Sequence, residues 1–232
     1  MMGMDMTEHI GTYFGHVLPG TFFILWGLWW YRSAKPTPGP CSMTWEPLVI
    51  IPLTLLSGLG ELWWASWLMT DSSVSNYQHA TMYACFAVPA VCFLLSSRGL
   101  ISAKLPVLTL GGAFAATAGL FIAHGHHMAV SGTIHFLLAL LLGSAALVCV
   151  CEAVWPVPAL AVARCWLTIS TGVWFWIAAL VLYKSSYDMD SAGVVMRIHL
   201  FFIWHLLAVG LVLLLIHLRK VRRTLPVAGD IL

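Results

Sequence analysis

Histidine and glutamate side chains in apolar surroundings are the groups in this 232-residue sequence best suited to do chemistry. Glu61 lies inside an apolar run. Nine of the ten histidines lie in or beside such runs. They are His217, near the end of the last run, and the eight that concern us here, namely His16, His79, His124, His126, His127, His135, His199 and His205. Neutral imidazole and carboxylate together form the ligand set that proteins offer to zinc, iron and copper. These residue types therefore indicate a transition-metal site.

The elements that must position these side chains are predicted to be membrane-spanning helices. Hydrophobic residues make up 60% of the chain and charged residues 9%, against roughly 25% charged residues in an ordinary soluble domain. Apolar runs of about 20 residues indicate spanning helices, because lipid offers no partner to backbone polar groups. Seven such runs cover approximately residues 13–31, 47–69, 77–97, 105–127, 133–154, 160–183 and 194–218.

The predicted fold is therefore an all-α integral membrane bundle of seven transmembrane helices joined by short loops. Residues 1–12 form an amino-terminal tail, residues 13–218 the single transmembrane domain, and residues 219–232 a basic tail. The protein is expected to be multi-pass in an endomembrane or the plasma membrane.

The placement of lysine and arginine predicts the orientation. If the basic carboxyl-terminal tail is cytoplasmic, seven spans put the amino terminus in the lumen or outside the cell. Nine of the eleven cations then lie on the cytoplasmic side, in agreement with the positive-inside rule, and only Lys184 and Arg197 lie opposite. Six or eight spans would divide the cations more evenly.

On this topology the eight histidines fall in the luminal half of the bilayer. Glu61 joins them, because eight residues before the end of its span correspond to roughly 12 Å of depth. An ionisable group at such depth costs at least about 2.5 to 3.5 kcal/mol on insertion scales. A protonated carboxyl or a Glu–His hydrogen bond between helices explains any one of these residues, whereas their convergence from several helices favours a site.

Three classes of function are compatible with this pattern. The first is a luminal metal site, in an enzyme that acts on a lipid or small apolar substrate with Glu61 as ligand or catalytic base. The second is a transporter or channel for metal ions or protons. The third is a non-catalytic membrane scaffold, or a haem protein with axial imidazoles. The cytoplasmic half offers few polar groups beyond Glu152 and Arg164, and this scarcity argues against transport. We expect Glu152 and Arg164 to form an ion pair.

Several stretches carry a resemblance to a known family. They are GHVLPG at 15–20, NYQHATMY at 76–83, TGVWFW at 171–176 and WH at 204–205. Together with Glu61 and Glu152 in the same order, they resemble the transmembrane protein 45 family, also called domain of unknown function 716, from about residue 14 to 210. The resemblance implies a seven-helix membrane protein without an established activity. Its motif positions include His16, Glu61, His79, His124, His126, His135 and His205, the predicted ligand set.

The expected partners are membrane lipids and not nucleic acid, since no nucleic-acid motif appears and the basic tail suits anionic lipid. Small residues such as Gly111, Gly112 and Gly119 permit close helix contact inside one bundle or between two copies, so a homo-oligomer is compatible with the sequence. The methionines before residue 7 and His9 carry donors that suit Cu(I), although chance explains them equally well. His127, His199 and these methionines lie outside the family pattern.

Overall fold

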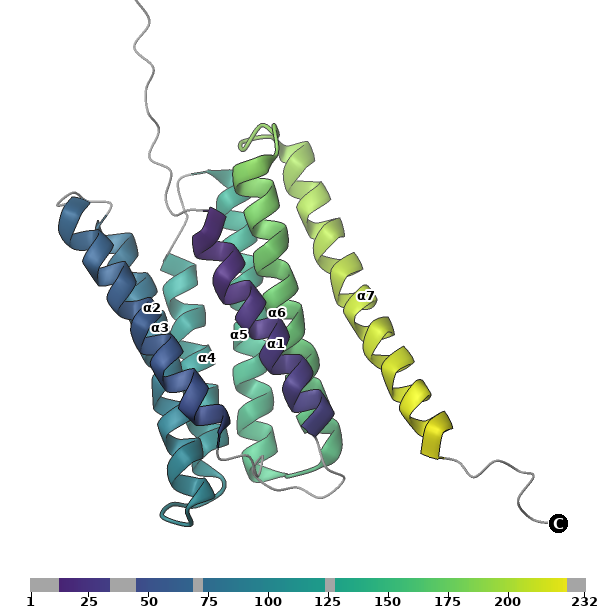
Figure 1. Ribbon diagram of the computed structural model, residues 1–232. Coiled ribbons are helices and arrows are strands. Elements are labelled where there is room, and N and C mark those ends of the chain that lie inside the picture. The colour runs from purple at the N-terminus through teal and green to yellow at the C-terminus, as the bar shows by residue number, and fades with distance from the viewer. Residues whose placement is uncertain (1–12, 34–44, 69–72, 124–127, 225–232) are drawn as a thin grey trace, which may run out of the picture.

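The computed structural model of the protein describes residues 13–33, 45–68, 73–123 and 128–224. All regular elements in these residues are helices, which run in alternating directions (Figure 1). They are α1 (Tyr13–Ser33), α2 (Glu46–Leu68), α3 (Ser73–Ser97), α4 (Leu105–Ala123), α5 (Ala129–Val154), α6 (Pro158–Lys184) and α7 (Ala192–Thr224). The predicted all-α bundle of seven helices is confirmed.

Six of these helices, α2 to α7, are long and apolar enough to cross a membrane, so the chain is an integral multi-pass membrane protein. The remaining helix, α1, has 21 residues and a length of about 31 Å, close to the roughly 30 Å of a hydrocarbon core. Its glycines, His16 and Pro19 lower its hydropathy. It nevertheless runs along α6 within the bundle (Figure 1).

The last helix is longer than the apolar pattern predicts. α7 continues past residue 218 to Thr224 and so takes up the first residues of the predicted basic tail. The added residues include lysine and arginine, which are good helix formers and interact favourably with the negative end of the helix dipole. Hydropathy marks where lipid contact ends, which is not where the helix must end.

The alternating directions give the bundle two distinct ends. We call the end with the start of α1 and the α6–α7 loop the histidine end, because His16, His79 and His135 lie in the first two turns of the helices that begin there. We call the opposite end, with Arg32, Arg98, Lys104 and Arg164, the basic end. That the histidine end faces the lumen stays a prediction.

Glycines hold α1 tightly against α6. A Cβ atom on Gly172 would lie 2.5 Å from the carbonyl oxygen of Gly20, and one on Gly27 would lie 2.4 Å from a side-chain carbon of Ile169. Small residues allow this approach of two backbones in lipid. In contrast, no Cα atom of α1 lies within 8 Å of a Cα atom of α2 in the described residues. The backbones of the first two helices therefore do not pack closely against each other.

An ion pair joins the helices at the basic end. Arg164 of α6 donates two hydrogen bonds to the carboxylate of Glu152 on α5, at 2.7 and 3.3 Å, as predicted. The same guanidinium lies 4.8 Å from the ring centre of Trp30 on α1, within cation–π range. The indole N–H of Trp30 donates to Glu46 at the start of α2. These contacts connect α1, α2, α5 and α6 near the basic end.

Backbone groups at two helix ends form hydrogen bonds with nearby residues. Gly99 has a φ of 72° and ends α3 in a Schellman motif, with its own N–H bonded to Ser96 and that of Leu100 bonded to Leu95. The start of α5 has no local side-chain cap, and the N–H of Ala129 instead donates to Asp190 of the α6–α7 loop. This contact holds the loop against the histidine end.

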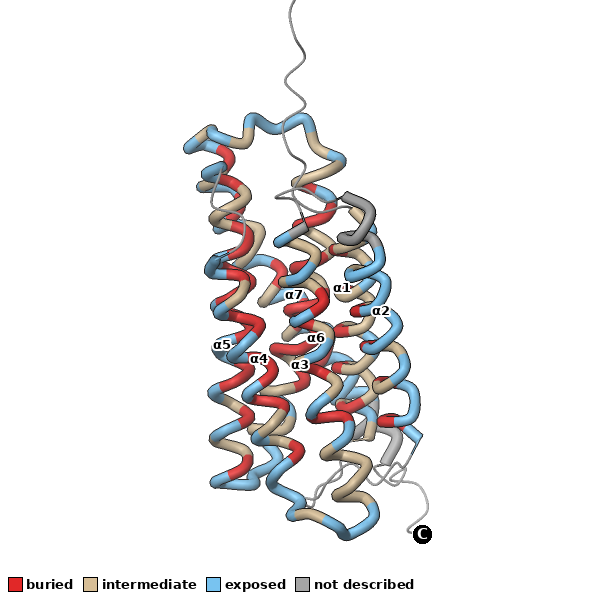
Figure 2. The backbone as a smooth tube through the Cα atoms, turned by 90° about the vertical axis from the view of Figure 1, so that its left-hand side faces the viewer, coloured by how far each residue is buried: buried red, intermediate tan, exposed pale blue. Residues whose placement is uncertain are grey.

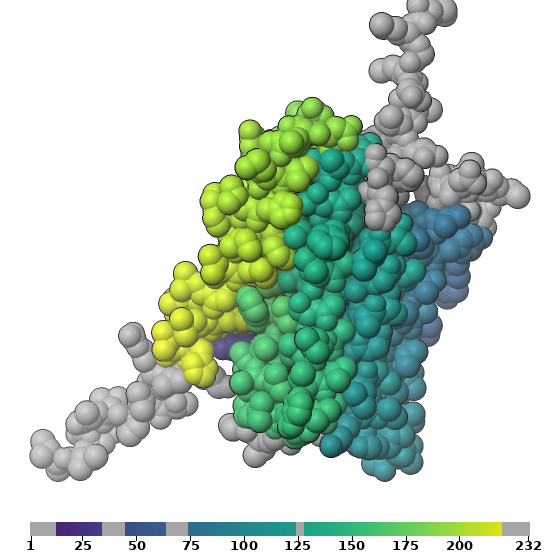
Figure 3. Space-filling view, turned by 180° about the vertical axis from the view of Figure 1, so that it is seen from behind, coloured from purple at the N-terminus to yellow at the C-terminus, as the bar shows by residue number. Residues whose placement is uncertain are grey.

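Exposed and buried residues alternate along the outer helices, and the exposed ones are largely apolar, as expected for surfaces in lipid (Figure 2). α7 leans away from the bundle toward its carboxyl end (Figure 3). Two side chains bind its backbone, with Trp166 donating to the carbonyl of Leu206 and Tyr31 to that of Leu213.

Candidate functional site

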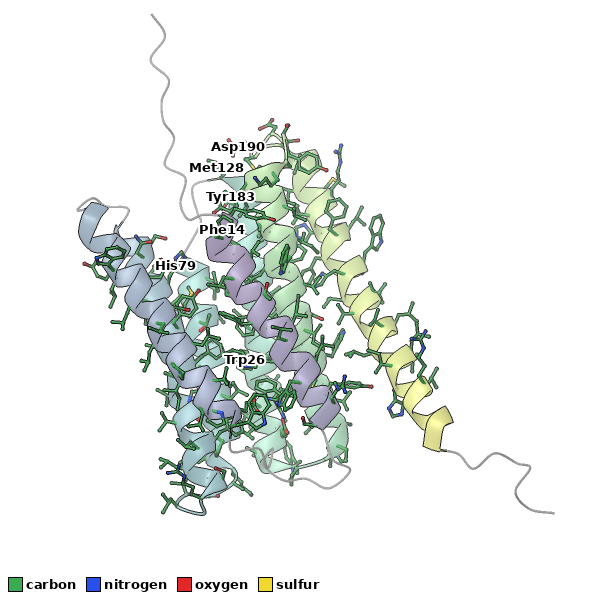
Figure 4. The ribbon with its side chains drawn as sticks, in the orientation of Figure 1. Phe14, Trp26, His79, Met128, Tyr183 and Asp190 are labelled. Atoms are coloured by element: carbon green, nitrogen blue, oxygen red, sulfur yellow. The ribbon has the colours of Figure 1, made fainter. Side chains whose placement is uncertain are left out.

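A cavity lies between α1 and the pair formed by α2 and α3. Because α1 packs on α6 and not on α2, the space between them is filled only in part by side chains, and the cavity there is partly open. Figure 4 shows His79 near the histidine end of this space and Trp26 further toward the basic end. The lining of α1 runs from Gly15 to Trp26, about 16 Å along the helix, and one leaflet's hydrocarbon is about 15 Å deep.

The walls of the cavity are mainly aromatic and aliphatic. They comprise Gly15, His16, Pro19, Phe22, Phe23 and Trp26 of α1; Leu53 and Thr54 of α2; His79, Met82, Tyr83 and Phe86 of α3; Thr117 and Phe121 of α4; and Phe175 of α6. The void measures about 660 Å³ with its open side included, and its enclosed volume is about 60 Å³. A single water needs roughly 10 to 15 Å³ of enclosed volume, so the cavity has room for a guest larger than one water.

The first polar pair of the cavity joins α2 and α3. Nδ1 of His79 lies 3.6 Å from Oε2 of Glu61, and both side chains are largely shielded. Tyr83, one turn further along α3, is close enough to Glu61 to interact with it electrostatically. The predicted partner for the Glu61 carboxylate is therefore present, and of this pair His79 lines the cavity.

The second polar pair joins α1 and α5. The ring of the buried His16 lies 5.9 Å from that of His135 and 5.4 Å from that of Tyr183, measured between centres. Nδ1 of His135 is 2.8 Å from the carbonyl oxygen of Ser131, to which it donates, and this fixes Nε2 as the nitrogen with the lone pair. Phe121, which lines the cavity, stacks on the His135 ring at 5.8 Å.

His205 lies elsewhere. It is thirteen residues into α7, about 20 Å from the start of that helix, whereas His79 and His135 are about 9 Å from the start of theirs. Its ring stacks on Trp174 at 5.1 Å and meets Phe202 at 5.3 Å. It does not line the cavity. The physical reason is that α6 packs against both α1 and α7 and stands between them.

The predicted ligands thus do not form one cluster within the part of the chain that the structure describes. Glu61 pairs with His79, His16 meets His135, and His205 is apart; the cavity brings together His16 and His79. His124 and His126 lie outside the described residues. No group of three or more His, Cys, Asp or Glu side chains in the described ranges is arranged to hold a metal ion.

Two threonines line the cavity in different hydrogen-bonding states. The hydroxyl of Thr54 donates within α2, at 3.0 Å from the carbonyl oxygens of both Ile50 and Ile51. The hydroxyl of Thr117 on α4 is buried, with the residue 2% exposed, and has no hydrogen-bond partner among the described residues. Leaving a buried donor unsatisfied costs about 1 to 3 kcal/mol. Ser75, Ser96 and Ser170 also have buried hydroxyls without a partner among the described residues, but of these four residues only Thr117 lines the cavity.

Sequence reasoning did not identify Thr117 or the aromatic walls. A signal for the walls exists, because His79, Met82, Tyr83 and Phe86 follow the helical spacing of three and four residues. In a helix bundle such a stripe more often marks packing between helices than a binding site. These side chains line a cavity because α1 packs against α6, and the sequence of α3 cannot predict where α1 packs.

The family of unknown function DUF716 matches residues 103–218, half of the chain. The match covers α4 to α7 and includes Thr117, His135, the Glu152–Arg164 pair and His205. No solved structure matches the chain. The earlier resemblance is confirmed by this match, and the chain belongs to the DUF716 family.

Proposed function

We propose that this protein takes one hydrocarbon chain of a membrane lipid into the cavity and acts on the lipid's polar end with Glu61, His79 and His16. The observation that carries this proposal is a partly open apolar cavity that has the imidazoles of His16 and His79 in its wall and the Glu61 carboxylate beside His79. A lipid presents the same two parts in the same order along the bilayer normal.

The lining favours a lipid over an ion as the occupant. Beyond the histidines, the cavity offers mainly the rings of Phe22, Phe23, Trp26 and Phe86 and few polar atoms. An ion would have to give up its hydration shell there without replacement, at a large cost. A hydrocarbon chain gains about 0.8 kcal/mol per methylene only relative to water, so its entry from lipid depends on fit to the walls.

The polar pair suits acid–base chemistry on the bound lipid. The Glu61 carboxylate lies on the Nδ1 side of His79, which favours the tautomer with a proton on Nδ1 and a basic Nε2. A histidine oriented in this way by a carboxylate is a general base for water or a hydroxyl group. Glu61 would then be a positioning residue, and His79 the catalytic residue.

Lipid occupancy is tested by filling the cavity. Thr54→Phe places a ring in it, and no interhelical hydrogen bond is lost, because the Thr54 hydroxyl bonds within its own helix. Leu55→Phe is the matched control, since Leu55 is the next residue and is 51% exposed. Native mass spectrometry of purified protein should show about one lipid bound to the wild type and to Leu55→Phe, and little to Thr54→Phe. Equal retention by both variants would refute the proposal.

A metal ion at the same pair is a second candidate. The 3.6 Å between His79 Nδ1 and Glu61 Oε2 is long for a hydrogen bond. Two ligands at about 2.0 to 2.2 Å from one tetrahedral ion are roughly 3.3 to 3.6 Å apart, which the pair matches. Zinc, iron or copper would take further imidazoles from His16 or from His124 and His126, and would activate water for hydrolysis of the lipid.

Elemental analysis separates the two candidates. If the pair binds a metal, about one ion per chain should stay with detergent-purified wild-type protein and be lost in Glu61→Gln and His79→Ala. His199→Ala is the control, because that histidine is exposed and bonds only within α7. A wild-type protein that folds and contains no stoichiometric metal would eliminate the metal and leave the Glu61–His79 pair as the chemical group.

A further inference from the structure

Thr117 is the one residue of the described cavity wall whose buried side-chain oxygen has no partner. Other hydroxyls in the spanning helices, such as those of Thr54, Thr168 and Thr171, donate to a carbonyl one turn earlier. The same bond is geometrically open to any threonine in a helix. The Thr117 hydroxyl does not make it, and Thr117 is a residue of the cavity wall.

The position of Thr117 narrows what could bind it. Thr117 is one turn, about 6 Å, deeper along α4 than Phe121, whose ring stacks on His135. A group that binds Thr117 must therefore lie just below the level of the histidines, where the cavity becomes apolar. In an ester lipid the acyl carbonyl occupies this place, since it is the deepest polar atom before the hydrocarbon chain begins.

We propose that the Thr117 hydroxyl donates a hydrogen bond to the acyl carbonyl oxygen of an ester lipid held in the cavity. This inference rests on the proposed function and adds to it the class of lipid, an acyl ester and not an alkyl ether. The carbonyl supplies the acceptor that the hydroxyl lacks, and the hydroxyl fixes how deeply the lipid is seated relative to His79 and His16.

The experiment uses two lipids that differ at one atom group. Delipidated full-length protein is titrated with lysophosphatidylcholine and with its ether analogue of equal chain length, in which a methylene replaces the ester carbonyl. The wild type should bind the acyl lipid roughly two- to tenfold more tightly than the ether, the range of one net hydrogen bond. Thr117→Val should bind both equally, through weaker binding of the acyl lipid.

Thr109→Val is the matched control. It removes a hydroxyl from the same helix, but one that already donates to carbonyls of that helix and does not line the cavity, so it should keep the wild-type preference. A Thr117→Val protein that still prefers the acyl lipid would overturn the inference, as would a wild type that binds both lipids equally. If the wild type binds neither lipid, the proposed function fails as well, so the two failures can be told apart.

The melting temperature gives a second test, which distinguishes a lipid-binding threonine from one that only stabilises the fold. Because the Thr117 hydroxyl makes no bond in the empty protein, Thr117→Val should not lower the melting temperature of delipidated protein. It should reduce only the extra melting temperature that the acyl lipid confers on the wild type. A lower melting temperature without lipid would show that the hydroxyl has a protein partner and would count against the inference.

Discussion

Glu152 and Arg164 show how a single charged pair can be read from sequence and then tested. The two side chains are 14% and 12% exposed, so each is held largely away from solvent by its neighbours. Glu152→Gln should destabilise the protein by roughly 3 kcal/mol, because it leaves the Arg164 charge without its counterion. Thermal unfolding in detergent measures this.

The double variant Glu152→Leu with Arg164→Met completes the test. Removing both charges at once leaves neither uncompensated, so most of the lost stability should return. Recovery will be incomplete because Arg164 also contacts the ring of Trp30. A double variant no more stable than Glu152→Gln alone would show that the pair is not the source of the effect.

At the scale of residues, the sequence predicted pairs better than clusters. Glu61 and His79 were expected in one layer, and they meet because they lie at similar depths on neighbouring helices. His205 was assigned to the same layer from its place in an apolar run, yet α7 begins at Ala192 and carries it deeper. Apolar length gives approximate depth, but it does not give the direction in which a side chain points around its helix.

At the scale of elements, the packing of α1 on α6 is the feature that creates the cavity. Gly172→Ala should force the two backbones apart, since its Cβ would meet Gly20 at 2.5 Å, and should cost about 1 to 3 kcal/mol. Gly112→Ala is the control, because its Cβ would meet nothing within 4 Å. Melting temperatures of the two variants compare them directly. Equal melting temperatures would mean that α1 does not pack as closely as described.

The sequence predicted the helices themselves closely, since each long apolar run became one helix with ends within a few residues. It could not predict which helices would be neighbours. The glycines of α1 favour a close contact, but a glycine in one helix does not name its partner. Short loops suggest that consecutive helices pack together, and α1 with α2 is the exception that matters here.

Orientation is a property of the whole molecule and is open to a direct test. The cations gathered at the basic end predict that this end is cytoplasmic, because positively charged loops resist translocation. A glycosylation acceptor added to the amino terminus should be modified in cells, and one added to the carboxyl terminus should not. The reverse pattern would place the histidines and the mouth of the cavity on the cytoplasmic side.

The contact between the first and sixth helices also has a consequence for biogenesis. α1 emerges from the ribosome first, but its partner α6 is complete only at Lys184, about 150 residues after Ser33. At synthesis rates of about 5 to 20 residues per second, α1 waits roughly 8 to 30 s for its packing surface. During that interval Gly20 and Gly27 must face lipid or an insertion factor, so the cavity forms only after α6 has been made.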